Sequence, residues 1–308
     1  MLDILGKRYT YFGVSLLIII PGLIVLAIWG LPLAIDFVGG SLLEVGFDSG
    51  TAPEPAKVVN LYNQLGISDV QVQTSGNGDI LIIRSPSLEN ETRTMVLSSM
   101  EEEFNDTITV RQFNTVGPTI GKEVTSRAAV AVAFAALGVV LYMTFAFRGV
   151  PNAWRYGLCA IVAMIHDILV IISIASIGGH FWGWEIDSLF LTALLTVIGF
   201  STQDTIVVFD RVRENKNIHR RLPFEKLVNH SIVQTLQRSI NTQLMTSEFL
   251  LLAMALLGGV TLRQFALVLL IGLASGTYSS IFIAAPVLVV WEKKEWKTWF
   301  KRGKPSTA

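Results

Sequence analysis

The chain has a single cysteine, Cys159, and few charged residues, because Asp, Glu, Lys and Arg make up only 16% of its 308 residues. One cysteine excludes an intramolecular disulfide. The scarcity of charge goes with an excess of apolar residues, which are 51% of the chain and give a mean hydropathy of +0.53. This apolar content is above that of ordinary soluble domains and favours an integral membrane protein.

The sequence also lacks the residue patterns of a catalytic or metal site. No spacing of His, Cys, Asp or Glu resembles a metal-ligand set, and no nucleophile stands beside a suitable base. Residues 117–122 resemble a phosphate-binding loop, but the spacing is one residue short and Glu123 takes the place of the Ser or Thr. We therefore predict no enzyme activity, no cofactor and no metal, and we interpret this segment as a turn that leads into a helix.

Acidic and basic residues are equal in number but unevenly placed. Residues 32–122 contain 12 acids and 5 bases, whereas the rest of the chain contains 12 acids and 19 bases. These bases lie beside apolar stretches, so the sequence does not suggest nucleic-acid binding. The pattern predicts an acidic insert within a basic membrane protein.

Six apolar stretches are long enough to cross a bilayer, since a span needs roughly 20 apolar residues. They are residues 11–31, 126–147, 157–177, 188–209, 239–257 and 264–291. Lys and Arg gather at every second flank, beginning with Lys7 and Arg8. Because basic flanks remain in the cytoplasm, we expect both termini inside and the acidic insert outside.

The predicted organisation has four parts. A cytoplasmic N-terminus and first helix occupy 1–31, an extracytoplasmic domain 32–125, a five-helix transmembrane bundle 126–291 and a cytoplasmic tail 292–308. Within the insert, strand patterns at 41–47, 70–74, 80–84 and 108–116 alternate with helix patterns at 53–65 and 88–104. Gly76-Asn77-Gly78 predicts a hairpin turn. The resulting order, βαββαβ, predicts a small α+β ferredoxin-like domain.

Ionisable residues inside the predicted spans are the most informative about function, because charge at membrane depth usually faces a protein interior or a wet path. His166 and Asp167 lie in the third span and Asp204 in the fourth. Arg238 begins the fifth span, and Glu248 lies about ten residues further in. An Asp that gains and loses an Arg partner releases and takes up a proton, which makes Asp204 and Arg238 a candidate pair.

His166 is a candidate relay beside this pair, since the reference pKa of histidine is near neutrality. The alternative for all of these residues is a static role, as a buried pair or as a polar contact that only fixes helices. The role of Glu248 stays open. In the sixth span, Gly272 and Gly276 are followed by Thr277, Ser279 and Ser280. We assign this segment to close helix packing rather than to chemistry.

Six motifs follow one another along nearly the whole chain. They are Asp36-Phe37-Val38-Gly39-Gly40, Val116-Gly117-Pro118, His166-Asp167, the run DTIVVFDRVREN that starts at Asp204 and includes Asp210, Arg211 and Arg213, the run TLQRSINT that includes Arg238, and GTYSSIF from Gly276. In this order they resemble the motifs of the SecD/SecF family of protein-export membrane proteins, on the SecF side. Gln203 departs from the Asn that the family commonly has before the Asp of the fourth span.

The resemblance implies a multi-pass protein of the bacterial or archaeal cytoplasmic membrane that assists the Sec protein-export machinery. With SecD, such a subunit uses the proton-motive force to promote late translocation or release of exported chains. The resemblance places the family's proton-linked Asp and Arg at Asp204 and Arg238. The external domain is expected to swing on Gly39, Gly40, Gly117 and Pro118.

The partners implied are SecD, the SecYEG channel, exported polypeptides and, as a further candidate, the YidC insertase. Whether H⁺ or Na⁺ drives the cycle stays open. Two other functions remain as alternatives. One is a non-catalytic scaffold of the translocon. The other is a small-molecule exporter of the related RND superfamily, against which the single small insert argues.

Overall fold

The computed structural model describes residues 2–75, 78–148, 152–243, 249–257 and 260–295. The chain forms two compact units. The helical unit comprises Met1–Leu31, Ala131–Trp184 and Leu189–Ala308. The sheet unit comprises Pro32–Val130 and Glu185–Ser188.

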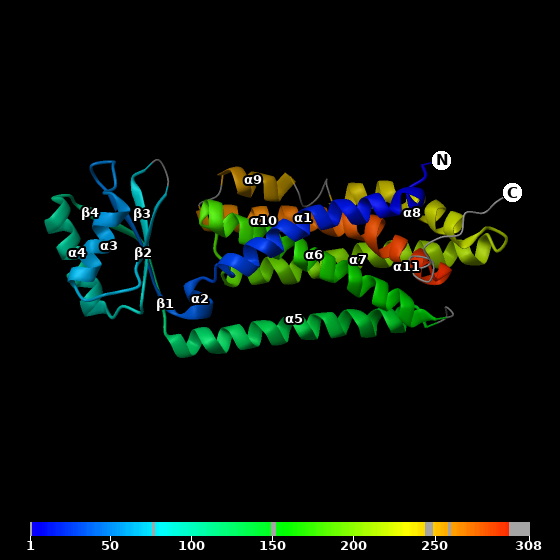
Figure 1. Cartoon of the computed structure of the whole chain (residues 1–308), viewed down its shortest axis with the longest axis horizontal. Coiled ribbons are helices and arrows are strands. Elements are labelled where there is room, and N and C mark those ends of the chain that lie inside the picture. The colour runs from blue at the N-terminus through cyan, green and yellow to red at the C-terminus, as the bar shows by residue number, and fades with distance from the viewer. Residues whose placement is uncertain (1, 76–77, 149–151, 244–248, 258–259, 296–308) are drawn as a thin grey trace. The chain divides into compact units, whose positions relative to one another are not determined.

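Long apolar helices dominate the chain (Figure 1). Five helices of the described residues are long and apolar enough to cross a membrane. The first joins η1 (Leu5–Lys7) to α1 (Arg8–Trp29), and the next three are α5 (Pro118–Ala146), α6 (Ala153–Trp182) and α7 (Ser188–Ile218). The last, Leu262–Lys293, runs through α10 (Val260–Ser279), the π-helical segment η3 (Ser280–Ala284) and α11 (Ala285–Lys293). These helices agree with five of the six predicted spans.

The predicted stretch 239–257 is not one helix among the described residues. Helix α8 (Phe224–Gln243) ends within it and α9 (Phe249–Leu257) begins later. Residues 239–243 read Ser-Ile-Asn-Thr-Gln, which is too polar to continue an apolar run. Residues 244–248, which include Glu248, lie outside the described part of the chain.

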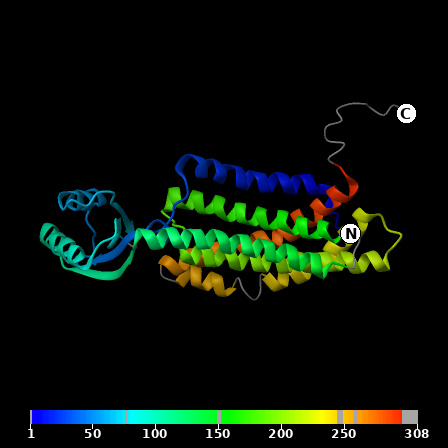
Figure 2. The ribbon, with the colours of Figure 1, turned by 90° about the horizontal axis from the view of Figure 1, so that it is seen from below.

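Small residues let the membrane helices approach one another closely. Helix α1 runs alongside α6 (Figure 2), and a Cβ added at Gly22 would lie 2.1 Å from the Cβ of Ser173. The Ser173 hydroxyl donates to the Ile19 carbonyl at 3.2 Å. A Cβ at Gly272 would lie 2.3 Å from Cγ2 of Val197 on α7. The close approach predicted for Gly272 and Gly276 is therefore confirmed for α10 against α7.

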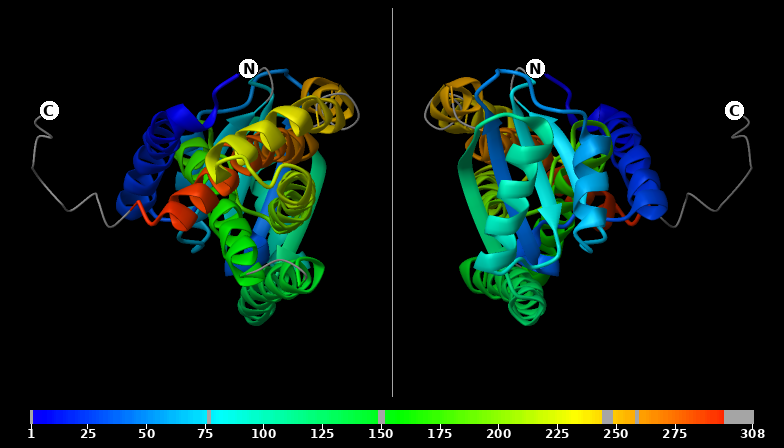
Figure 3. Two further views of the ribbon diagram at one scale, coloured as in Figure 1. Left: turned by 90° about the vertical axis from the view of Figure 1, so that its right-hand side faces the viewer. Right: turned by 90° about the vertical axis from the view of Figure 1, so that its left-hand side faces the viewer.

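The sheet unit contains four antiparallel strands and two helices in the order β1 (Gly40–Phe47), α3 (Pro55–Gln64), β2 (Gln71–Ser75), β3 (Ile80–Ser85), α4 (Asn90–Phe104) and β4 (Ile108–Val116). The strand order in the sheet is β2-β3-β1-β4. Both helices lie on one face of the sheet (Figure 3, right). Alternate residues of the strands face these helices, so Val45 and Leu81 are buried against Tyr62 and Met100. The predicted turn residues Gly76 and Asn77 lie outside the described residues.

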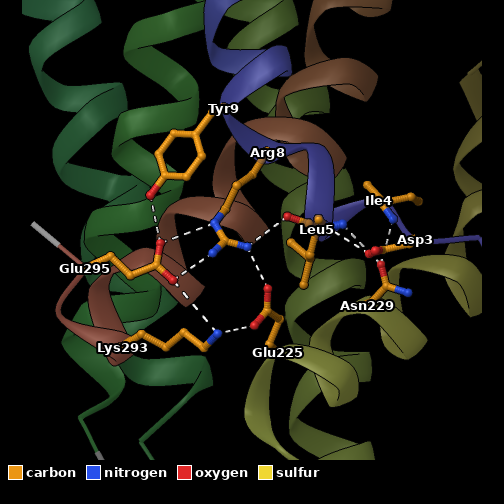
Figure 4. Close-up of polar contacts among 10 residues, drawn as sticks. Asp3, Ile4, Leu5, Arg8, Tyr9, Glu225, Asn229, Lys293 and Glu295 are labelled. Carbon is orange, nitrogen blue, oxygen red and sulfur yellow. Dashed lines mark hydrogen bonds and ion pairs between the residues drawn. The ribbon is translucent and has the colours of Figure 1, made fainter. Parts of the chain in front are cut away.

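An ion-pair cluster centred on Arg8 joins three helix ends of the helical unit (Figure 4). The Arg8 guanidinium contacts Glu225 at the start of α8 at 2.6 Å and Glu295 just beyond α11 at 2.7 Å. Lys293 also pairs with Glu225, and the Tyr9 hydroxyl donates to Glu295 at 2.8 Å. The bonds from Lys293 and Arg8 lower the pKa of the Glu225 carboxyl, with the hydrogen bond from Lys293 as the largest cause. The sequence analysis treated Arg8 only as a flanking charge.

Candidate functional site

Asp167, in the middle of α6, is held by hydroxyl groups from two other helices. Its side chain is 1% exposed. It accepts hydrogen bonds from Ser201 of α7 at 2.6 Å and from Ser275 of α10 at 2.6 Å. A third bond comes from Ser279 at 2.7 Å. Three donors can satisfy a buried carboxylate without a cation, because each supplies one O–H to its lone pairs.

Asp204 of α7 is buried in the same way, at 6% exposure. Ser239 of α8 donates to its Oδ1 at 2.7 Å, and Ser280 of η3 donates to its Oδ2 at 2.7 Å. Ser201 and Asp204 lie three residues apart on α7, almost one helical turn. The two carboxylates are therefore linked through α7 as well as through the end of α10.

His166 extends this network toward α1. Its Nδ1 lies 3.2 Å from Oδ1 of Asp167, and its Nε2 lies 2.9 Å from the hydroxyl of Ser15. The imidazole stacks on the Tyr278 ring, with centroids 5.9 Å apart. The Tyr278 hydroxyl donates to the Tyr11 carbonyl at 2.8 Å and lies 3.4 Å from the Ser15 hydroxyl. Hydrogen-bonding groups thus run in a line from α1 through His166 to Asp167, and the adjacent residues Ser279 and Ser280 connect this line through the backbone to Asp204 and α8.

Two hydroxyls in this line have a choice of acceptor. Ser279 lies 2.7 Å from Asp167 and also 3.1 Å from the Gly276 carbonyl. Ser280 lies 2.7 Å from Asp204 and also 3.0 Å from the Thr277 carbonyl. A hydroxyl has only one hydrogen, so each can serve the carboxylate or its own helix but not both at full strength. This arrangement allows the hydroxyls to reorient when a carboxylate changes charge.

Arg238 does not contact Asp204 directly. Its side chain is exposed, while the next residue of α8, Ser239, is the one that bonds Asp204. Within the described residues, no ion pair joins Arg238 to either carboxylate at 4.0 Å or less. The structure thus brings Asp204 to the helix of Arg238 and supplies a hydroxyl at the contact.

The motif that starts at Asp204 continues toward a hairpin between α7 and α8. Arg213 lies 3.6 Å from Asp210 and donates to the Ala146 carbonyl at 3.2 Å. Arg211 donates to Gln234 of α8 at 2.7 Å and pairs with Glu214 at 2.6 Å. Asp210 thus pairs with Arg213, one turn further along α7. These residues fix the helix ends and lie apart from the buried carboxylates.

The other predicted motif residues lie in the sheet unit. Asp36 accepts two bonds from Ser188, the first residue of α7. Gly39 has a φ of +81° and Gly40 a φ of +127°, values that favour glycine. Pro118 begins α5, so the predicted turn at Gly117-Pro118 into the second span is confirmed.

The hydrogen bonds of these serines to the carboxylates were not predicted from the sequence. Ser279 and Ser280 belong to the segment assigned to packing, and in addition both donate hydrogen bonds to buried carboxylates. The available signal was the four-residue spacing of Ser275 and Ser279, which puts two hydroxyls on one face of a helix. In the part of the chain that the structure describes, no three His, Cys, Asp or Glu residues gather as a metal site.

Comparison with known proteins agrees with this architecture. The family model "Protein export membrane protein SecD/SecF, C-terminal" matches residues 96–294, and the SecD/SecF GG motif model matches residues 24–51. The chain is similar to the protein translocase subunit SecF of Anaerolinea thermophila, with 66% identity over 100% of both chains. It is 44% identical to that of Thermobaculum terrenum, over 100% of this chain and 99% of the relative.

Among solved structures, the chain is similar to the crystal structure of SecDF, a translocon-associated membrane protein from Thermus thermophilus. The identity is 31% and the TM-score 0.82, over 95% of this chain. SecDF in a super-membrane-facing form matches with a TM-score of 0.68 and 30% identity over 98% of this chain. The chain spans only 39% and 40% of these two SecDF chains. It belongs, on the strength of these matches, to the SecD/SecF family of protein-export membrane proteins.

Proposed function

We propose that the chain works with a SecD-type partner as a proton-driven subunit of the protein-export machinery. The observation that carries the proposal is the pair of adjacent serines, Ser279 and Ser280, which donate hydrogen bonds to the buried carboxylates of Asp167 and Asp204 respectively. Two buried acids held by reorientable hydroxyls, with the His166 imidazole beside one of them, are suited to changing charge. A purely structural contact would be served as well by uncharged groups.

The proposed cycle begins with a proton reaching Asp204. A protonated acid becomes a donor, so Ser280 turns toward the Thr277 carbonyl and its bond to Asp204 weakens. Arg238, one residue before Ser239, is then attracted less strongly to Asp204. Helix α8 can therefore shift against α7. His166 and Asp167 act as the second titrating site of the same network. Whether the driving ion is H⁺ or Na⁺ is an outcome of the test below.

The available energy is adequate for such a cycle. Moving one charge through 100 mV is worth about 2.3 kcal/mol. That free energy changes a two-state ratio by a few tens-fold, since about 1.4 kcal/mol is a factor of ten. One or two protons per cycle can therefore bias the position of a domain.

The proposal also includes the class of the sheet unit, the number of membrane crossings and the side of the membrane on which each part lies. We class the sheet unit as a ferredoxin-like domain because its elements follow the order βαββαβ, and we assign it to residues 32–125 outside the membrane. We count 239–257 as a sixth crossing, with both termini in the cytoplasm. The movement of the external domain passes through the connections that contain Gly39, Gly40, Gly117 and Pro118. Asp210, Arg211 and Arg213 fasten the cytoplasmic hairpin.

The partners follow from the same reasoning. Because the solved SecDF chains are more than twice as long as this one, we propose that a separate SecD chain supplies the remaining half. The SecYEG channel, the YidC insertase and exported polypeptides are the further partners proposed. No enzyme reaction is assigned.

The test uses Asp204→Asn in membrane vesicles that carry the partner and the channel. The variant should abolish the stimulation of export by a proton gradient while leaving the amount of assembled complex within two-fold of wild type. Asp210→Asn is the matched control, because Asp210 is an aspartate of the same helix outside the buried network. Undiminished stimulation in Asp204→Asn contradicts the proposal, and stimulation by a sodium gradient alone assigns Na⁺ as the driving ion.

A second candidate function is a scaffold that only holds its partners together. The full hydrogen bonding of Asp167 favours it, since a satisfied carboxylate can be static. In that case Asp204→Asn and Asp167→Asn lower the abundance of the complex, and the export that remains keeps its dependence on the gradient.

A further inference from the structure

Three separate stretches of the chain meet in the sheet unit at the start of α7. They are residues 32–40, 117–125 and 185–188, which we call the junction. The first and third stretches form a parallel bridge between Leu33 and Ile186. The Ile186 amide donates to the Pro32 carbonyl at 2.7 Å, and the Ala34 amide donates to the Ile186 carbonyl at 2.9 Å. The bridge is therefore closed by two backbone hydrogen bonds.

The first and second stretches touch backbone to backbone. A Cβ at Gly39 would lie 2.7 Å from Cα of Pro118, and one at Gly121 would lie 2.7 Å from the Gly39 amide nitrogen. The Thr125 hydroxyl donates to the Phe37 carbonyl at 3.0 Å. Gly39 and Gly121 are thus required for close contact, and a freely bending connection would not need that contact.

The third stretch is tied to the first by a helix cap. The Asp36 carboxylate accepts the Ser188 amide at 2.9 Å and the Ser188 hydroxyl at 2.6 Å. A carboxylate at this position satisfies an orphan N–H group and complements the positive end of the helix dipole. Asp36 therefore caps α7 from a distant part of the sequence.

An ion pair ties the same stretch to the sheet. Arg84 lies on β3, between β1 and β2, and pairs with Glu185, two residues before Asp187. The two side chains are only 14% and 19% exposed. Burial raises the pKa of the Glu185 carboxyl, and the Arg84 guanidinium opposes that shift. A pair this sheltered is screened less than one on an open surface.

We propose that Asp36 is a positioning residue that, together with the Arg84–Glu185 pair, fastens the head of α7 to the sheet. The junction then moves as one body, and a displacement of the sheet reaches α7. Asp204 lies 16 residues after Ser188 on this helix, a distance of about 24 Å along a stiff helix. Only this last step, from helix to export, rests on the proposed function. The fastening itself does not.

Hydrogen exchange on the chain with its partner tests the fastening directly. Removing an N-terminal cap costs roughly 1 kcal/mol, so Asp36→Ala should speed amide exchange in the first turn of α7 by about five-fold. Asp36→Asn keeps a carbonyl acceptor and should restore most of the protection, and Ser188→Ala keeps its backbone bond and should have a smaller effect. Asp79→Ala, which removes an exposed partner of Arg111 on the sheet, is the control. Equal exchange in Asp36→Ala and wild type overturns the proposal.

Swapping the charges of Arg84 and Glu185 tests the second tie, the ion pair. Arg84→Glu or Glu185→Arg alone should speed amide exchange in the first turn of α7 and should lower export. The double variant should restore both the slow amide exchange and the export. Recovery in the double variant cannot be explained by loss of folding in the singles. A double variant as impaired as the sum of the singles contradicts the pairing.

A reversible cross-link tests whether the junction stays closed during export. Bridge partners on neighbouring strands lie within the spacing that a disulfide needs, about 4.4–6.8 Å between Cα atoms. Leu33→Cys with Ile186→Cys, in a Cys159→Ala background, should therefore form a disulfide on oxidation, and export should stay within two-fold. Loss of export that a reductant restores overturns the proposal, because the junction would then have to open. If export proves independent of any ion gradient, the proposed function fails, while exchange and cross-linking still report on the fastening.

Discussion

Ser279 and Ser280 are adjacent in the chain, yet they donate hydrogen bonds to two different buried carboxylates, Asp167 and Asp204. The first acid belongs to α6 and the second to α7, so this one step of backbone joins three helices. The π-helical segment begins at Ser280. Such segments often occur at functional sites, because they alter the direction of neighbouring side chains.

The two serines should contribute separately to stability. Ser279→Ala and Ser280→Ala each remove a bond to a buried acid, and each should lower the free energy of unfolding by about 1.5–3 kcal/mol. Thermal unfolding in detergent measures the effect. Ser98→Ala on the surface of α4, where the hydroxyl bonds only its own helix, is the control and should change little. A loss no larger than that of Ser98→Ala in both variants would show that the bonds to the carboxylates are dispensable.

Asp167→Ala should be more harmful than Asp167→Asn. The alanine leaves three serine hydroxyls without their acceptor, whereas asparagine keeps one carbonyl oxygen in place. We expect a loss of about 3 kcal/mol for alanine and about half of that for asparagine, since each unsatisfied buried group costs roughly 1–3 kcal/mol. Chemical unfolding of the purified chain separates the two. Equal losses would indicate that the serines turn back to their own helices at no cost.

Gly272→Ala should be destabilising because α10 approaches α7 closely. The new methyl group would lie 2.3 Å from Cγ2 of Val197, and overpacking typically costs 1–3 kcal/mol. Val197→Ala should rescue the variant by removing the clash. Gly138→Ala is the control, because nothing lies within 4 Å of that position. Failure of the rescue would place the strain elsewhere.

The Arg8 cluster should give the chain a defined response to acid. The pKa of Glu225 is lowered below its ordinary value of 4.5, chiefly by Lys293 and also by Arg8. A lowered carboxylate pKa stabilises the fold above the unfolded value, and the contribution disappears as the pH falls through the folded value. Wild type should therefore unfold at a higher temperature than Glu225→Gln at neutral pH. This difference in unfolding temperature should disappear below pH 4.5.

The matched variant for this comparison is Glu214→Gln. Glu214 also pairs with an arginine, Arg211, but with a side chain that is 50% exposed. Exposed pairs contribute about 0–1 kcal/mol, so its gap from wild type should be small at every pH. If the difference in unfolding temperature between wild type and Glu225→Gln stays constant down to pH 3, the lowered pKa of Glu225 is contradicted.

Much of the sheet unit could be predicted from the sequence because its two periodicities are distinct. Alternating apolar residues define β1 and β3, and the helical spacing of Val58, Leu61 and Tyr62 defines α3. The buried acids were also predictable, because Asp167 and Asp204 interrupt otherwise apolar stretches. The predicted span 239–257 was less clear, since its first residues are polar.

The hydroxyl partners could not be predicted for a physical reason. A Ser or Thr in an apolar helix usually bonds a carbonyl of its own helix, as Thr196 and Thr202 do at 2.7 Å. The sequence looks the same when the hydroxyl faces a carboxylate on another helix. The contact depends on tertiary packing, which also decides that Ser239 rather than Arg238 meets Asp204.

The π-helical segment also sets the rotational phase of the last crossing. Five residues take part in the wide turn Ser280–Ala284, after which α11 resumes ordinary winding. If the same residues wound as a regular α-helix instead, everything after this turn would be rotated by about one residue, roughly 100°, relative to Ser275. Trp291 and Lys293 would then point away from Trp154 and Glu225, their present neighbours. A single surplus residue thus allows one helix to face the buried acids with its first half and to keep its far-end contacts with its second.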